Sequence, residues 1–400
     1  MSSGSLRAQK LVTATGDLPK RGASLGEPLV INDAVISWSD GSIDYVGPFE
    51  SYRGSEPKRT KGTVVPGFVD CHTHLPFFGW RADEFAARLR GVTYRDLHGE
   101  GGIFRSARLF NEASDTEVLE FCRDLLDEML RHGTTTVEFK TGYALSVEGE
   151  LRQAQLARRL ATEITQNTSL TLLACHAVPP GETREGWVEK ACRELIPAAA
   201  SEQLVDQVDI YVEDIAFSVE DLEAVATAAD KAGLPLRCHV EQLSNLHAAE
   251  RAGELGAISV DHLNHIDTAG VSSLGRSPSV ATLLPASTLV LGSEPPPARA
   301  LIDAGAAVAI ATDFNPGTSP VLSMPETIAF ACTLYKLSPE EAFVAATANA
   351  ACVLGQNARV GTLEVGKRAD FVVLERDIAD IPYRPGHNPV TQTVSGGVNV

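Results

Sequence analysis

The sequence has no long hydrophobic run, no surplus of basic residues and few aromatic ones. Nowhere do about 18 apolar residues follow one another, as a transmembrane helix requires, and the first residues, Met1 to Leu6, lack the apolar centre of a secretory signal. The 34 Lys and Arg residues are outnumbered by 52 Asp and Glu residues, which gives a net charge of −18. We therefore expect a cytoplasmic protein that binds neither nucleic acid nor a membrane, because nucleic acids and anionic membranes attract basic surfaces.

Closely spaced cysteine pairs are also missing. The chain has seven cysteines, an odd number, and no two of them form a Cys-x-x-Cys motif. Cys71, Cys175 and Cys238 each come directly before a histidine in an apolar stretch. We expect them to be small core residues that form no disulfides and bind no metal.

The two ends of the chain, residues 1–63 and 358–400, are both rich in short strand patterns. Asp40-Gly41 lies between two such patterns, and this pair is typical of a tight β-hairpin turn. The middle of the chain, residues 64–357, has a different pattern. These observations predict a small β-sandwich-like domain built from both chain termini, with one larger domain inserted between its two parts.

In the middle of the chain, apolar strand patterns alternate with helical patterns, several of which begin with a serine that can cap a helix. Eight strands with intervening helices predict an α/β fold of the (β/α)8 TIM barrel type. A doubly wound open sheet is the alternative. The expected strands are 64–75, 134–140, 170–178, 208–212, 234–240, 258–263, 280–285 and 307–312.

Two histidines one residue apart end the first of these strands. His72 and His74 share a face of the strand and can present two imidazoles to one ion, although a pair of hydrogen-bonded core histidines is the alternative. Four more candidate groups end later strands: His176, His239, His262 and Asp313. A barrel gathers such strand ends on one face, where these folds carry their chemistry, so the pattern favours the barrel and a metal site.

Several motifs occur in an order that resembles the amidohydrolase superfamily: Pro-Gly-Phe-Val-Asp-Cys-His-Thr-His at 66–74, a histidine after each of strands five and six, an aspartate after strand eight, and Gly-Thr-Leu-Glu-Val-Gly-Lys-Arg-Ala-Asp at 361–370. Within that superfamily, the stretches 136–143, 175–180, 239–245 and 312–320 resemble the imidazolonepropionase family. The resemblance covers almost the whole chain. It implies a hydrolase that acts on a cyclic amide C–N bond and converts 4-imidazolone-5-propanoate to N-formimino-L-glutamate.

The expected metal ligands are His72, His74, His239 and Asp313. Three imidazoles and one carboxylate suit Zn²⁺ or Fe²⁺, and such an ion lowers the pKa of a bound water towards about 7. Some superfamily members hold two metals bridged by a lysine at the end of strand four. The corresponding stretch, 209–214, has no lysine, so one divalent metal is expected, with bridging by Glu213 as the alternative.

Asp313 is also expected to transfer the proton from water to the leaving nitrogen, although an isolated aspartate here could instead cap the next helix. His262 is expected to polarise the carbonyl or stabilise the oxyanion. Two neighbouring residues compete for one further catalytic role. Strand parity places Glu241 on the same face as His239, whereas the family pattern assigns the substrate contact to Gln242, which we favour.

The substrate is expected to be a small anionic molecule. The family pattern matches Arg81 with an arginine whose planar guanidinium holds a carboxylate. The other matched contacts are Tyr143, His176, Gln242, Asn315, Gly317 and Thr318. Each of these side chains could instead have an ordinary structural role. Family resemblance also implies a homodimer.

Two loops depart from the family pattern, at 76–80 and 100–105, where bulky and charged residues replace small ones. Such changes can alter the fit of a ligand. The second hypothesis is therefore a related mononuclear cyclic amidohydrolase or deaminase that acts on another small nitrogen heterocycle. A non-catalytic barrel is a third possibility, which the complete ligand set argues against.

Overall fold

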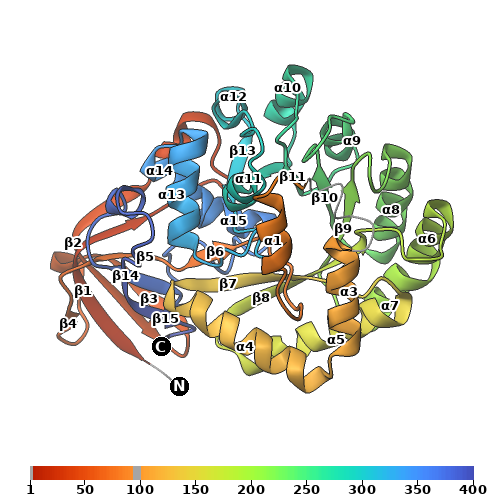
Figure 1. Ribbon diagram of the computed structural model, residues 1–400. Helices are drawn as coiled ribbons and strands as arrows, with labels where there is room; N and C mark the ends of the chain where they lie inside the picture. Colours follow the sequence, from red (N-terminus) through yellow and green to blue (C-terminus); the bar gives the residue numbers. More distant parts are fainter. Residues whose placement is uncertain (1–2, 93–100) are drawn as a thin grey trace.

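The computed structural model describes residues 3–92 and 101–400, which form a terminal sheet beside a barrel (Figure 1). The terminal sheet has the strand order β16-β15-β14-β5-β1-β2-β3, and β4 pairs with β1. Its strands come from both ends of the chain, as expected: β1 (Gly4–Thr13), β2 (Leu29–Ser39), β3 (Ser42–Pro48), β4 (Lys58–Arg59), β5 (Thr63–Pro66), β14 (Phe371–Leu374), β15 (Val390–Ser395) and β16 (Val398–Asn399). The hairpin at Asp40-Gly41 is confirmed, because Ser39 pairs with Ser42.

The second sheet has eight strands that follow one another in chain order, each parallel to its neighbours. They are β6 (Phe68–Asp70), β7 (Thr134–Lys140), β8 (Asn167–Cys175), β9 (Gln207–Val212), β10 (Leu236–Val240), β11 (Ser259–His262), β12 (Val280–Leu283) and β13 (Ala307–Ile310). Backbone hydrogen bonds close the ring just beyond the ends of β6 and β13: Asp313 N donates to His72 O at 3.0 Å, and His74 N donates to Phe314 O at 2.9 Å. The predicted (β/α)8 barrel is therefore confirmed.

Helices cover the outside of this barrel (Figure 1). Ser114, Ser218 and Ser338 each cap a helix and form a capping box with the acidic residue three positions later. In the described part of the chain, no helix is both long and apolar enough to cross a membrane. The helices are α1 (Ala82–Arg88), α3 (Gly102–Glu112), α4 (Asp115–Arg131), α5 (Val147–Glu163), α6 (Arg184–Lys190), α7 (Ile196–Ser201), α8 (Val219–Ala232), α9 (Ala248–Glu254), α10 (Thr268–Arg276), α11 (Pro285–Leu291), α12 (Ala298–Asp303), α13 (Met324–Tyr335), α14 (Pro339–Ala345), α15 (Ala348–Val353) and α16 (Asp380–Tyr383), with short η1 (Gly22–Gly26), η2 (Phe49–Ser51) and η3 (Ala191–Leu195) turns.

The single strand expected over 64–75 is instead two strands that belong to different sheets. β5 pairs with β1 and β14 in the terminal sheet, whereas β6 begins the barrel. Gly67 separates them: its N–H donates to Asp370 O at 3.1 Å, and a Cβ at this position would lie 2.0 Å from Thr135 Oγ1. A side chain at position 67 would collide with the neighbouring strand β7, so the change of sheet at this point requires glycine. The division of the chain at 63/64 and 357/358 into two domains stays a proposal.

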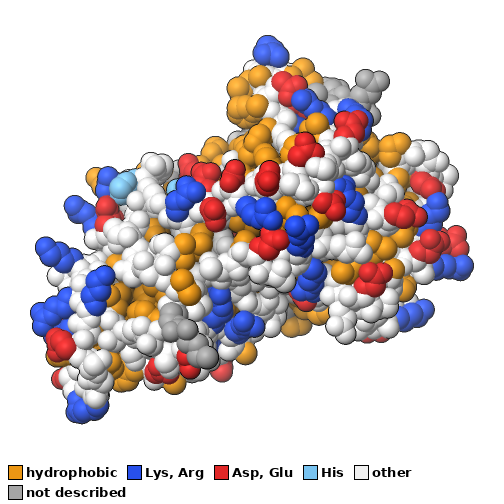
Figure 2. Space-filling view, turned by 90° about the horizontal axis from the view of Figure 1, so that it is seen from below, with side chains coloured by type: hydrophobic (Ala, Val, Ile, Leu, Met, Phe, Trp, Pro, Cys, Tyr) orange, Lys and Arg blue, Asp and Glu red, His pale blue; other side chains and the backbone are white. Residues whose placement is uncertain are grey.

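The other barrel strands match the expected ranges to within three residues, and β8 departs most, since it runs over Asn167–Cys175 where 170–178 was expected. The described cysteines are all free, and Cys71, Cys175 and Cys238 are buried, as predicted. Lys and Arg side chains lie among Asp and Glu side chains on the face shown in Figure 2, so the net negative charge is not gathered in one acidic region of that face.

Candidate metal centre and substrate cavity

Closure of the barrel brings three of the predicted metal ligands together. His74 Nε2 lies 3.1 Å from Asp313 Oδ1, and His72 Nε2 lies 3.6 Å from the same oxygen. His239 joins this group from β10, with its ring centroid 4.4 Å from that of His72. Ligand atoms of His72, His74 and Asp313 lie within 4.8 Å of one another, as do those of His72, His239 and His262. The two groups share His72, so all the predicted ligands surround one small space.

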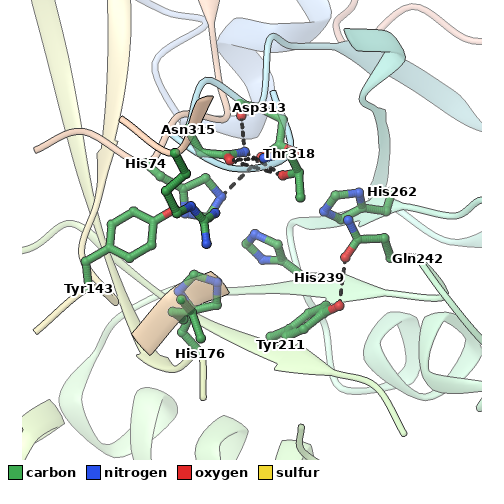
Figure 3. A pocket seen from close by; sticks show the side chains of 12 residues that line it. His74, Tyr143, His176, Tyr211, His239, Gln242, His262, Asp313, Asn315 and Thr318 are labelled. Carbon is green, nitrogen blue, oxygen red and sulfur yellow. Dashed lines mark hydrogen bonds and ion pairs between the residues drawn. The ribbon is translucent and has the colours of Figure 1, made fainter. Parts of the chain in front are cut away.

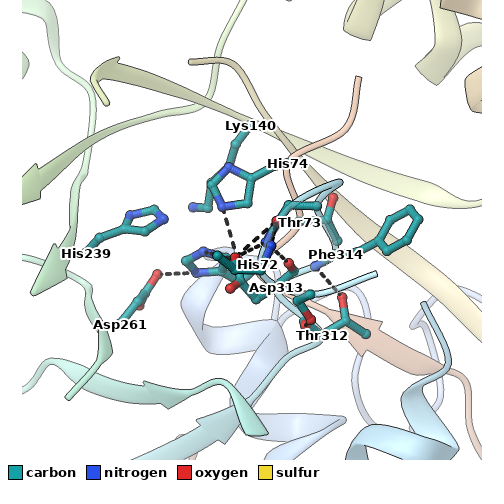
Figure 4. Close-up of polar contacts among 12 residues, drawn as sticks. His72, Thr73, His74, Lys140, His239, Asp261, Thr312, Asp313 and Phe314 are labelled. Atoms are coloured by element: carbon teal, nitrogen blue, oxygen red, sulfur yellow. Dashed lines mark hydrogen bonds and ion pairs between the residues drawn. The ribbon is translucent and has the colours of Figure 1, made fainter. Parts of the chain in front are cut away.

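Two aspartates orient the imidazoles from outside this space. His72 Nδ1 donates to Asp261 Oδ2 at 2.7 Å, as Figure 4 shows, and His239 Nδ1 lies 3.0 Å from Asp209 Oδ1. A carboxylate at Nδ1 keeps the proton there and leaves the lone pair of Nε2 free. His72 Nε2 and His239 Nε2 are buried and have no hydrogen-bond partner among the described residues. Buried nitrogens of this kind need a partner, and a divalent cation fits this donor set.

Burial disfavours the charged form of four histidines at this site. It lowers the pKa of His72, His74 and His176 well below the usual value, and nearby positive or imidazole groups lower it further. Burial also lowers the pKa of His262, to about 3, although Asp313 opposes that shift. Neutral imidazoles can bind a metal, whereas protonated ones cannot.

Several of these groups follow strand ends where the backbone takes a left-handed conformation. The φ angles are +55° at Asp313, +82° at His262, +64° at Leu263 and +52° at Glu241. Non-glycine residues adopt this conformation rarely, and it is commonly found at functional sites. The turn ends the regular alternation of the strand and directs the next side chain towards a different part of the barrel mouth.

The ligand space opens into a cavity at the mouth of the barrel (Figure 3). Ten of the residues predicted from the sequence line it: His74, Arg81, Tyr143, His176, His239, Gln242, His262, Asp313, Asn315 and Thr318. The other lining residues are Ile103, which belongs to the departing stretch 100–105, and Tyr211, which sequence reasoning did not find.

A positive charge lies in this cavity. Arg81 is buried with 4% of its surface exposed, and its Nε and Nη1 have no hydrogen-bond partner among the described residues. Glu84 Oε2 lies 3.7 Å from Nη1. A buried guanidinium with unused donors is suited to a planar anion such as a carboxylate.

The turn after Asp313 supports this arginine. Asn315 Oδ1 accepts from Gly317 N at 2.9 Å and from Thr318 N at 2.7 Å, which fixes a tight turn. Gly317 does not line the cavity, but its backbone packs directly against Arg81. A Cβ on Gly317 would lie 1.3 Å from Arg81 Nη2, so only glycine allows the guanidinium this position.

The structure distinguishes Gln242 from Glu241, the two candidates for the further catalytic role, which directly follow β10. Gln242 lines the cavity, and Tyr211 donates to its Oε1 at 2.8 Å. Glu241 lies outside the cavity lining, and its Oε1 accepts from Ala249 N at 3.1 Å. Parity along the strand pointed to Glu241, but β10 ends at Val240 and the left-handed backbone at Glu241 breaks the alternation.

The bulky loop after the two histidines packs away from the cavity lining. Phe77 is fully buried, and the ring of Trp80 contacts those of Phe77, Phe121 and Phe314 at centroid distances of 5.5, 5.7 and 6.0 Å. The aromatic substitutions therefore form a cluster beside the cavity. Glu100, from the second departing loop, lies outside the described residues.

The residue considered as a bridge between two metals has another function in the fold. Glu213 Oε1 accepts from Leu243 N at 2.7 Å, and its Oε2 accepts from Ser244 Oγ at 2.6 Å. This carboxylate therefore holds the loop after β10 and does not line the cavity.

Comparisons with known proteins give the family. The model of the amidohydrolase family matches residues 63–400. The chain is 41% identical over 379 residues to an imidazolonepropionase from Rhizorhabdus wittichii, covering 92% of this chain and 95% of that protein. It is 42% identical over 369 residues to an imidazolonepropionase from Aeromonas salmonicida, covering 90% of this chain and 89% of that protein.

Solved structures share the fold. A guanine deaminase from C. acetobutylicum with bound guanine superposes with a TM-score of 0.72 at 17% identity and full coverage of both chains. A guanine deaminase from E. coli gives a TM-score of 0.73 at 18% identity, covering 99% of each chain. At this identity the likeness extends to the fold alone.

Proposed function

The chain belongs to the amidohydrolase family and, within it, to the imidazolonepropionases, and from this premise we propose how its residues perform their reaction. The enzyme hydrolyses the cyclic amide of imidazolone propionate in histidine degradation. The observation that carries the assignment of roles is that the imidazoles proposed to bind a metal and a buried arginine line the same cavity.

We propose that His72, His74, His239 and Asp313 hold one divalent cation, either Zn²⁺ or Fe²⁺. The free Nε2 atoms of His72 and His239 support this ligand set, and the engagement of Glu213 with the loop after β10 supports a single ion. When bound, the cation supplies Lewis acidity, which makes water nucleophilic near neutral pH and polarises a carbonyl group.

Asp313 is proposed as the group that moves the proton. Burial raises the pKa of its carboxyl above the ordinary value, while His262 and His239 oppose that shift. A carboxylate with a raised pKa is a better base, so Asp313 accepts the proton of the attacking water and returns it to the ring nitrogen as the C–N bond breaks. His262, a neutral imidazole at the cavity wall, donates a hydrogen bond to the carbonyl oxygen as negative charge develops there.

Other residues of the cavity lining are proposed to bind the substrate. Arg81 holds the propionate carboxylate with its unused donors, and Asn315 and Thr318 support that end of the molecule. Gln242 contacts the ring, and Tyr143 and His176, whose ring centroids are 5.5 Å apart, form a wall beside it.

The purified full chain, stripped with a chelator and refilled with Zn²⁺ or Fe²⁺, tests the proposal. We expect turnover of imidazolone propionate with either ion and its loss in Asp313→Asn, while His247→Ala serves as the control because His247 is exposed at the surface. Full metal occupancy without turnover, combined with activity on another cyclic amide or on a ring amine, would instead favour the related amidohydrolase or deaminase.

We also propose a cytoplasmic location and a homodimer, as the family resemblance implies. Light scattering of the purified enzyme at micromolar concentration is expected to give twice the 42.6 kDa chain mass. A monomer mass would contradict the proposed assembly but leave the chemistry intact.

A further inference from the structure

Behind the ligands lies a group of five charged residues that the reaction itself does not use. Glu138 and Lys140 come from β7, Asp209 from β9, Arg237 from β10 and Asp261 from β11, and all have 0% of their surface exposed. Buried charges are costly unless they are paired. The pairing of these five is therefore informative.

The group forms two branches that meet at one carboxylate. Lys140 Nζ donates to Asp209 Oδ2 at 2.8 Å, and Asp209 contacts His239. Arg237 Nη2 donates to Asp261 Oδ2 at 2.8 Å, and Asp261 contacts His72.

Glu138 joins the two branches. Its Oε1 accepts from Lys140 Nζ at 2.9 Å and also from Arg237 Nη1, while Thr171 Oγ1 donates to the same oxygen. No other described carboxylate contacts both cations. Glu138 therefore links the two branches, while Arg237 is also held by Ser259, to whose Oγ its Nε donates at 2.9 Å.

We propose that Glu138 is a positioning residue, which through Lys140 and Arg237 sets the two aspartate–histidine pairs for the cation. This inference rests on the proposed metal site. Glu138 restrains the two cations so that each aspartate is left to accept from its imidazole. It also makes the group net negative, with three carboxylates against two cations, which favours a divalent ion nearby.

The variant Glu138→Gln keeps the shape of the side chain and removes its charge. We expect its affinity for Zn²⁺, measured by competition with a chromophoric chelator, to fall about 10- to 100-fold, the range typical of changes behind metal ligands. Its activity should recover when free Zn²⁺ is raised above the new Kd. The matched control is Glu150→Gln, which also alters a buried glutamate but one that accepts from the backbone N–H groups of Gly142, Ala144 and Leu145, outside this network.

Both variants are expected to lose thermal stability, so stability alone does not decide the question. Unchanged Zn²⁺ affinity in Glu138→Gln, or an equal loss in Glu150→Gln, would overturn the inference. Should Glu138→Gln fail to fold, Thr171→Val is the second variant, because it removes one hydrogen bond to Glu138 without changing the charge. We expect it to weaken the affinity for Zn²⁺ two- to tenfold, which corresponds to the loss of about one hydrogen bond. A wild-type chain that binds no Zn²⁺ or Fe²⁺ would instead refute the proposed function.

Discussion

Replacement of Gly317 by alanine should displace Arg81 without touching the metal ligands. The new Cβ would lie 1.3 Å from Arg81 Nη2 and 2.3 Å from Cζ, and an ordinary contact begins near 3.4 Å. One of the two groups must therefore move by about 2 Å. The backbone at 317 is held on both sides, because its N–H donates to Asn315 and its carbonyl accepts from Arg88 at 3.0 Å. The guanidinium is thus the group that moves.

A displacement of this size breaks the hydrogen bonds from Arg81 to a substrate carboxylate. Hydrogen bonds to a charged group are worth about 1.5–3 kcal/mol, so losing one corresponds to about a 10- to 150-fold lower kcat/KM. The carboxylate takes no part in the bond-breaking step of the proposed reaction, so we expect most of the loss in KM. Zn²⁺ content should remain one ion per chain.

Steady-state kinetics on Gly317→Ala, with metal content measured on the same sample, tests this reasoning. Gly26→Ala is the control, because its Cβ would meet Glu341 Cγ at an ordinary 3.5 Å. An analogue without the carboxylate should react equally poorly with wild type and Gly317→Ala. A KM within twofold of wild type for the natural substrate would show that Arg81 does not bind it where the structure places this side chain.

Three further outcomes follow from single contacts. Burial raises the pKa of Glu241 from its ordinary 4.5 to about 7, so the folded state keeps a proton that the unfolded chain releases. The free energy of unfolding should therefore fall by up to about 3 kcal/mol as pH rises from about 4.5 to 7, and a chemical denaturation series at several pH values should show this dependence reduced in Glu241→Gln. Tyr211→Phe removes the hydrogen bond that fixes Gln242, which should lower kcat/KM about three- to tenfold without changing Zn²⁺ affinity. Chelation of the cation should lower the melting temperature, because a ligand at 100 times its Kd contributes about 2.7 kcal/mol of stability. The far-ultraviolet circular dichroism should stay native at room temperature, and an unfolded spectrum after chelation would contradict this expectation.

The sequence was most informative where a strand pattern is bounded clearly at both ends, and the strand over 134–140 was predicted with the bounds that β7 has. The failure came at 64–75, because the apolar residues on both sides of Pro66-Gly67 were taken as one strand, although a Pro-Gly pair commonly interrupts a strand. Only contacts with Thr135 and Asp370, distant in sequence, show why the chain must leave one sheet at Gly67.

The cavity could be predicted only in part for a similar reason. Histidines and aspartates at strand ends were recognisable from residue type and position, but Tyr211 lies within an apolar strand and looked like an ordinary core aromatic. Glu138 and Arg237 were missed because a single charged residue within a strand does not show which buried partner it has. Their roles follow from contacts between strands, which no pattern along one strand contains.

Closure of the barrel and assembly of the proposed ligand set are one structural event. The same stretch that supplies His72 and His74 forms backbone hydrogen bonds with the stretch that supplies Asp313, and Thr312 donates from both N and Oγ1 to Asp70 beneath them. These bonds join backbone groups and a buried carboxylate and need no cation, so the protein can place three of the proposed ligands before any ion arrives. If the donors are in position beforehand, a cation binds without first ordering the chain, which lowers the entropy that its binding would otherwise cost. The fourth proposed ligand, His239, is not part of that seam, and its Nδ1 lies 3.0 Å from Asp209, one of the charged residues buried behind the site.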